Sequence, residues 1–252
     1  MKKFELTTEF ITNALGKKLF RIKALVEFGS VKAGELGGYA EKEENISQDG
    51  NAWVSGDARV YGNAWVSGDA RVYGDAWVHG NAKVFGNAEV YGDAKVSDNA
   101  KVFGNAKVYG DAKVSDNAKV FGDACVYGDA KVYGNAWVYG DAWVHGNAKV
   151  FGNAWVYGDT EVSGDAKVSD NAEVSGDADY ALVKGFGTEF RCTTFYRDKN
   201  KKIMVNCGCF HGDLEAFRKQ VKETRSGKIA KEYLMIADLM EYHFTSEDSS
   251  NE

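Results

Sequence analysis

The sequence from Asn51 to Gly176 is one six-residue phrase repeated twenty-one times without a gap. The phrase is Asn/Asp-Ala-x-Val-x-Gly, with Asn or Asp first and Val fourth in every copy, and with Thr160 as the one exception at the Ala position. Three copies end in Asp instead of Gly, at Asp98, Asp116 and Asp170. A repeat this strict constrains the fold more than any other property of the chain, because every copy must form the same short element and bury its apolar side chains against its neighbours.

Each phrase predicts a short strand followed by a corner. The Ala and Val positions are two residues apart, so in an extended strand both side chains lie on one side and the residue between them faces outward. The Gly-Asn or Gly-Asp pair that follows tolerates the positive φ that a tight corner demands. A helix is excluded because a period of six with two inward residues fits no 3.6-residue face.

The variable positions repeat every eighteen residues, which predicts three strands per coil. Asp98 and Asp116 are eighteen residues apart, and Asp170 follows after fifty-four. The position after Val forms aromatic columns at the same spacing, namely Phe85, Phe103, Phe121, Tyr139 and Tyr157, and Tyr73, Tyr91, Tyr109 and Tyr127. We therefore expect a triangular prism of seven coils, about 34 Å long at ~4.8 Å per strand, with these rings stacked as ladders.

The segments on either side of the repeat predict caps for its open ends, since terminal coils need covering. Residues 1–50 are expected to form an N-terminal cap and a first irregular coil, with short strands at 4–6 and 19–25. Counting back in sixes places Ile46 on the Ala position and Gln48 on the Val position. The regular coil is assigned to residues 51–178.

Residues 179–244 are expected to form a small α+β capping unit. Residues 189–196 and 202–207 alternate as the two strands of a hairpin. Asp213 can cap a helix over 214–224, and a second helix is expected over about 228–243. The polar, acidic residues 245–252 are expected to be disordered.

The phrase resembles the hexapeptide repeat of left-handed parallel β-helix proteins (the transferase-hexapeptide or LpxA-like superfamily), with Ala52 as the small and Val54 as the aliphatic inward residue. The flanks are similar to YdcK-like and phage or prophage hexapeptide-repeat proteins, through residues 19–24 with 37–39, 180–187 and 205–210. The resemblance implies a left-handed coil, because periodicity predicts three sides but not their hand. The expected fold is mainly β: a single-stranded, three-sided, left-handed parallel β-helix with an N-terminal β cap and a C-terminal α+β unit.

One side of this prism carries a column of lysines, at Lys95, Lys113, Lys131, Lys149 and Lys167. The column could bind a polyanion or a small anionic ligand. The alternative is a solvated face on which corner aspartates balance each lysine; Asp93, Asp98, Asp111 and Asp116 are examples. The repeat holds 11 basic and 16 acidic residues, which favours the solvated face and makes nucleic acid an unexpected partner.

All six tryptophans occupy outward positions, at Trp53, Trp65, Trp77, Trp137, Trp143 and Trp155. Exposed tryptophan is enriched at protein interfaces. Two interpretations therefore stay open. The tryptophans form a surface for a protein partner or for homo-oligomer formation, centred on Trp137, Trp143 and Trp155, or they simply stack on neighbouring lysine stems.

An enzyme needs features that the repeat does not offer. Acyltransferases that the phrase resembles typically carry an extruded loop with a catalytic histidine beside it, whereas the twenty-one phrases run uninterrupted. His79 and His145 occupy an ordinary corner position. We therefore expect no catalytic residue and no cofactor.

A weak candidate metal site lies in the C-terminal unit, where Cys207, Cys209 and His211 alternate and Cys192 lies on the neighbouring strand. Structural zinc sites usually present cysteine pairs two to four residues apart on a turn, so free thiols are the expectation. The chain has four cysteines without a secretory signal, which favours the cytoplasm. It has no apolar stretch long enough to span a bilayer, so no membrane association is expected.

The chain is therefore predicted to be a non-enzymatic scaffold, a rigid β-helix that presents aromatic and lysine ladders for protein interaction or self-association. Two alternatives stay open: an acyltransferase-like hexapeptide-repeat enzyme, and a phage-type sequestering protein for a small anionic ligand.

Overall fold

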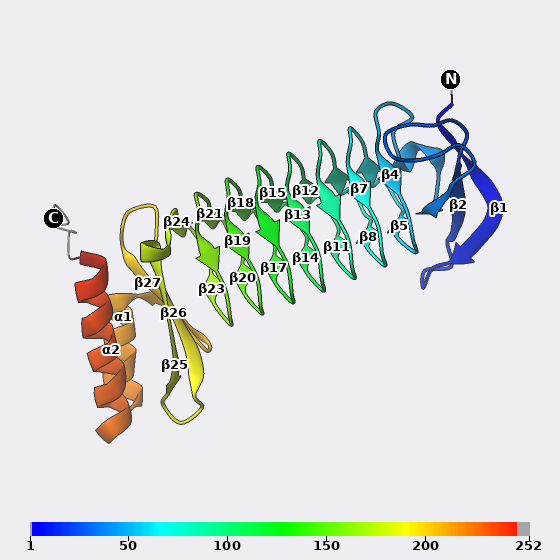
Figure 1. Ribbon diagram of the computed structural model, residues 1–252. Coiled ribbons are helices and arrows are strands. Elements are labelled where there is room, and N and C mark those ends of the chain that lie inside the picture. Colours follow the sequence, from blue (N-terminus) through cyan, green and yellow to red (C-terminus); the bar gives the residue numbers. More distant parts are fainter. Residues whose placement is uncertain (1, 246–252) are drawn as a thin grey trace, which may run out of the picture.

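The computed structural model describes residues 2–245 as an elongated rod with a coil in its middle and a folded unit at each end (Figure 1). Each of the twenty-one phrases contributes a two-residue strand made of its third and fourth residues, from β4 (Trp53–Val54) in steps of six residues to β24 (Glu173–Val174). Together with the irregular first turn this makes a parallel β-solenoid of about eight turns, as predicted.

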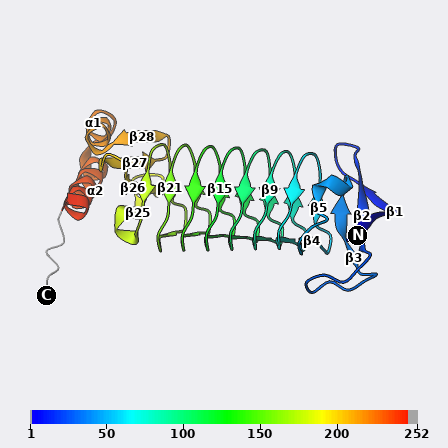
Figure 2. The ribbon, with the colours of Figure 1, turned by 90° about the horizontal axis from the view of Figure 1, so that it is seen from above.

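Every third strand belongs to the same sheet, so parallel partners are eighteen residues apart, as in Val90↔Val108. The lysine face runs from β5 (Arg59–Val60) to β23 (Lys167–Val168). The tryptophan face runs from β6 (Trp65–Val66) to β24, and the mixed face from β4 to β22 (Glu161–Val162). The three-sided prism read from the eighteen-residue period is confirmed; Figure 2 shows the stacked coils from above.

The inward positions form one continuous core along the rod. The Ala and Val side chains between Ala70 and Val156 are fully buried in a single apolar cluster. The corner glycines from Gly56 to Gly164 have φ between 63 and 75, a region that favours glycine. The outer rings stack as expected: the Phe85 and Tyr73 columns have centroid separations of 4.8–5.0 Å.

The first turn departs from the count in sixes. Ile46 pairs with Val66 and not with an Ala position, and Ala40 pairs with Val60. In each of these pairs the partners are twenty residues apart and not eighteen, because the corner after Ile46 holds two residues more than a regular corner. Gln48 accordingly lies in that corner, where its Oε1 accepts a hydrogen bond from the Lys3 backbone N–H at 2.7 Å.

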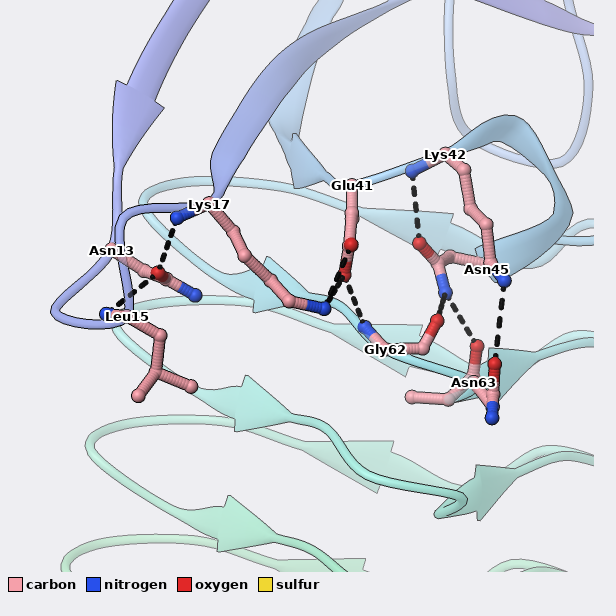
Figure 3. Close-up of polar contacts among 9 residues, drawn as sticks. Asn13, Leu15, Lys17, Glu41, Lys42, Asn45, Gly62 and Asn63 are labelled. Atoms are coloured by element: carbon pink, nitrogen blue, oxygen red, sulfur yellow. Dashed lines mark hydrogen bonds and ion pairs between the residues drawn. The ribbon is translucent and has the colours of Figure 1, made fainter.

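The N-terminal unit extends the lysine face by three strands, β1 (Phe4–Thr12), β2 (Lys18–Ala24) and β3 (Leu36–Ala40), before a 3-10 turn at Glu43–Asn45. Polar contacts attach it to the first coil (Figure 3). The Glu41 carboxylate accepts hydrogen bonds from the Lys17 ammonium at 2.9 Å and from the Gly62 backbone N–H at 2.6 Å. The Asn45 amide donates to the Gly62 and Ala64 carbonyls at 3.1 and 2.8 Å, so the open edge of the coil is covered.

The C-terminal unit is a four-stranded antiparallel sheet backed by two helices, and it contains the expected hairpin. Its elements are β25 (Tyr180–Phe186), β26 (Arg191–Arg197), β27 (Ile203–Cys207), β28 (Phe210–Asp213), α1 (Leu214–Thr224) and α2 (Gly227–Thr245). Asp213 caps α1 as predicted, because its Oδ1 accepts the Ala216 backbone N–H at 2.9 Å.

The predicted tail begins at Thr245, which is instead the last residue of α2, and residues 246–252 lie outside the described part of the chain. Neither helix within residues 2–245 combines the length and apolar character needed to cross a membrane.

Candidate binding surfaces

The lysine column of the sequence forms one groove on the lysine face. Register pairs Lys95 with Lys113, Lys113 with Lys131, and so on to Lys167, one coil apart. The groove has a volume of ≈ 610 Å³. Its other wall is a column of first-position residues that the sequence analysis did not sort by side: Asp75, Asp93, Asp111, Asp129, Asn147 and Asp165.

The aspartate column decides the electrostatics of this groove. Asp93 and Asp111 were expected to balance the lysines, and both line the groove, whereas Asp98 and Asp116 occupy the next corner. At the C-terminal end the Lys184 ammonium binds the Asp165 carboxylate at 2.8 Å. Hydrogen bonds from Lys184 and Asn147 lower the pKa of Asp165. Paired columns of opposite charge leave little net field for an anionic ligand.

The tryptophan face has a different column at its first position. Its first-position residues are all asparagine, and the amide of one coil donates to the amide of the next from Asn63 to Asn153 at 3.0–3.3 Å. An amide can both donate and accept a hydrogen bond, so these asparagines form a ladder along the axis of the coil. Lysines on this face, such as Lys101, therefore follow a first-position column of asparagine, and the aspartates of the same corner are the ones that replace glycine, among them Asp98 and Asp116.

Three tryptophans form a ridge near the C-terminal end of the rod, defined here as Trp137, Trp143 and Trp155. Trp137 and Trp155 stack on the tryptophan face with centroids 5.3 Å apart, and Trp143 follows Trp137 around one corner, on the mixed face. Trp143 is 49% and Trp155 42% exposed. The Lys119 ammonium lies 4.1 Å from the Trp137 ring and Tyr127 meets Trp143 edge-on, so the ridge is held in place.

Trp53 occupies an outward position as predicted, but it does not share the exposure of Trp143 and Trp155. This side chain points outward from the first regular coil but is only 5% exposed. The rings of Phe4 and Phe28, both from the N-terminal unit, pack against it at 6.4 and 5.4 Å. Trp53 therefore anchors the cap.

The two corner histidines are held by ring contacts. His79 stacks on Tyr61 at 4.9 Å, and burial lowers its pKa. His145 stacks on Tyr127 at 4.7 Å, and its Nε2 lies 2.7 Å from a Glu161 carboxylate oxygen. Both therefore continue the ladders of their corners.

The weak metal candidates are divided by the C-terminal sheet. His211 pairs with Asn206 on the side that faces the coil, where its Nε2 lies 2.7 Å from Asp170. Cys207 packs on the opposite side, in the core formed with the helices, and Cys209 is exposed in the turn. Burial raises the pKa of the Cys192 thiol. Within residues 2–245 no three His, Cys, Asp or Glu side chains come together as a metal site.

The coil-facing side of this sheet instead holds a buried network that sequence reasoning missed. The Ser169 hydroxyl lies 3.1 Å from the Tyr196 hydroxyl and 3.0 Å from the Asn206 amide, which also donates to the Lys167 carbonyl. Burial raises the pKa of Tyr196 to about 12. The network attaches the C-terminal unit to the last coil, and the alternation of polar residues in β26 and β27 was its only sequence signal.

The match to a known repeat family supports the fold of the coil. Three segments of the coil, residues 52–68, 64–80 and 130–146, match the YdcK β-solenoid repeat family. Among solved structures, the chain is similar to a candidate acetyltransferase from Bacillus cereus, at 11% identity and a TM-score of 0.29, with 74% of this chain and 90% of that chain covered. No curated protein sequence matches the chain.

Proposed function

Because the chain is a YdcK-like hexapeptide-repeat β-solenoid protein, we propose that it is a non-enzymatic, rod-shaped scaffold that binds another protein through the tryptophan ridge. The proposal rests on the exposure of Trp143 and Trp155 beside one corner of a rigid coil. Tryptophan is the residue most enriched among interface hot spots, and large exposed apolar patches mark interaction sites.

Rigidity supports this role. The ridge rings are already held in the free chain, because Trp137 stacks on Trp155 and lies under the Lys119 ammonium, and Trp143 packs edge-on against Tyr127. Little side-chain entropy is therefore lost on binding. An uninterrupted coil and corner histidines that continue the aromatic ladders favour binding over acyl transfer. The proposed setting is the cytoplasm, where the four free cysteines stay reduced.

Hydroxyl-radical footprinting of tryptophan tests the ridge directly. Trp65 is a matched control because it is 41% exposed on the same face as Trp155 but at the other end of the rod. We expect Trp143 and Trp155 to be oxidised more slowly in native lysate than in the purified chain, with Trp65 unchanged. Equal oxidation of all three tryptophans in both samples would refute the proposal.

Variants then connect the ridge to the partner. The Trp143→Ser/Trp155→Ser variant should lose the protein that co-purifies with the tagged chain, as read by native mass spectrometry. Trp65→Ser should retain it. Loss in both variants would point to general unfolding or to a wider surface, and retention in both would show that the ridge is not the contact.

A further inference from the structure

Helix α2 is apolar on two opposite faces. Its inner face is buried in the C-terminal core, through Tyr233, Ile236, Ala237, Met240 and Phe244. On the opposite face, Met235, Leu239 and Tyr242 are 61%, 58% and 72% exposed. Their i, i+4, i+7 spacing places them in one stripe, and a contiguous exposed apolar stripe between charged residues marks an interaction site.

Helix α1 shows that this stripe is not a general feature of the unit. The outward residues of α1 are charged, among them Glu215, Arg218, Lys219, Lys222 and Glu223. The two helices share one core but present different residues outside. The apolar stripe is therefore specific to α2.

The stripe lies at the free end of the rod. Figures 1 and 2 both show α2 as the outermost element, on the side of the C-terminal unit away from the coil. No segment within residues 2–245 covers the stripe, because all three of its side chains are more than half exposed. A second molecule with an apolar stripe of its own would provide a cover of matching chemistry.

We propose that the stripe binds the same stripe of a second copy of this chain, with the two α2 helices antiparallel around a two-fold axis at Met235. The charges beside the stripe support this occupant. At 100° per residue, Lys231 and Asp238 flank Met235 along the same edge of the helix, one turn before it and one turn after it.

Antiparallel pairing places Lys231 of each copy beside Asp238 of the other, so the contact is self-complementary. A parallel pair would instead place the two copies of this edge on opposite sides of the contact, so that Lys231 and Asp238 would not meet. The Arg218 guanidinium binds the Asp238 carboxylate at 2.7 Å and holds it at the edge of the stripe. The same register places Lys228 over the Tyr242 ring of the second copy, where a cation–π contact is favourable.

The pairing joins two rods end to end, with both N-terminal units pointing outward. It leaves the tryptophan ridge unused, so it is independent of the proposed protein binding. One helix per copy gives an interface below the standard size, so the dimer should be concentration-dependent.

Sedimentation velocity of the full chain over about 1–200 µM tests this pairing. We expect a reversible monomer–dimer equilibrium whose Kd rises at least about tenfold in Leu239→Glu, where two buried carboxylates would face apolar side chains. Lys222→Glu on the outer face of α1 is the matched control and should leave the Kd unchanged. Lys231→Glu should weaken the dimer, and Lys231→Glu/Asp238→Lys should restore it. A chain that stays monomeric throughout, or a dimer unaffected by Leu239→Glu, would overturn the proposal.

Cysteine cross-linking tests the orientation. In a Cys209→Ser background, Met235→Cys should form a covalent dimer under mild oxidation, because its two copies meet at the axis. Tyr242→Cys should not cross-link, since antiparallel pairing separates its two copies by about 21 Å. Cross-linking of both variants would show parallel pairing and overturn the arrangement.

Discussion

A substitution at one corner tests why the coil tolerates aspartate where glycine is the rule. Gly134 has φ 73, and a Cβ added there would lie 2.9 Å from the Gly152 nitrogen and 3.0 Å from its oxygen. One coil earlier, Asp116 occupies the same corner at φ 58, and its carboxylate accepts the Gly134 backbone N–H at 2.9 Å. Gly134→Asp would repeat that arrangement against Gly152, whereas Gly134→Ala would not.

The two substitutions differ by one hydrogen bond. The left-handed conformation costs an L residue about 1–2 kcal/mol, and the close contact adds about 1–2 kcal/mol, so Gly134→Ala should lose about 2–4 kcal/mol. A hydrogen bond to a carboxylate returns about 1–2 kcal/mol, so Gly134→Asp should lose correspondingly less.

Thermal unfolding followed by circular dichroism measures the difference. At about 2–4 °C per kcal/mol for a chain of this size, Gly134→Ala should lower the Tm by about 4–16 °C and Gly134→Asp by roughly half as much. Gly16→Ala isolates the conformational part of the cost, because Gly16 has φ 76 and no neighbour within 4 Å of an added Cβ. If Gly134→Asp is as unstable as Gly134→Ala, the carboxylate does not explain the aspartate corners.

Three further predictions follow from single features of the rod. The pKa of Tyr196 is raised to about 12 from an ordinary 10, so between these pH values the hydroxyl stays protonated in the folded chain and ionises in the unfolded chain. The free energy of unfolding should therefore fall by about 2–3 kcal/mol between pH 10 and 12. Urea titrations of Tyr196→Phe should show less of this loss. Neutralising the aspartate column with Asp93→Asn/Asp111→Asn/Asp129→Asn should create salt-dependent heparin binding in an affinity assay. Adding Lys95→Gln to this variant should weaken the binding. Equal heparin binding by the native chain would show that the aspartate column does not offset the lysines. Asn99→Asp replaces the amide that donates to Asn117 at 3.3 Å by a second acceptor, so it should lower the free energy of unfolding by about 1–2 kcal/mol, and an unchanged urea midpoint would contradict the ladder.

Most of the coil could be predicted because its interactions are local in the repeat. Period six places Ala and Val inward, and period eighteen places Phe85 over Phe103, whatever lies elsewhere in the chain. The aspartate column of the lysine groove was equally accessible, since sorting the first position by eighteen separates an all-asparagine column from a mainly aspartate one. The count failed at Ile46, where two additional corner residues break the period.

Exposure and the grouping of distant residues required the tertiary structure. Trp53 and Trp143 occupy equivalent outward positions, yet Phe4 and Phe28, far away in sequence, cover the first and nothing comparable in the described chain covers the second. Likewise, Cys207 and His211 are close in sequence but lie on opposite sides of one sheet.

The coil, its three faces and the column to which each side chain belongs all follow from the repeat alone, because a strict repeat converts spacing directly into position. The folded arrangement was needed to see which columns are offset by neighbours, which rings the caps cover and which face of α2 is exposed. Those outcomes depend on contacts between segments that are far apart in the sequence, and the period of the repeat does not predict such contacts.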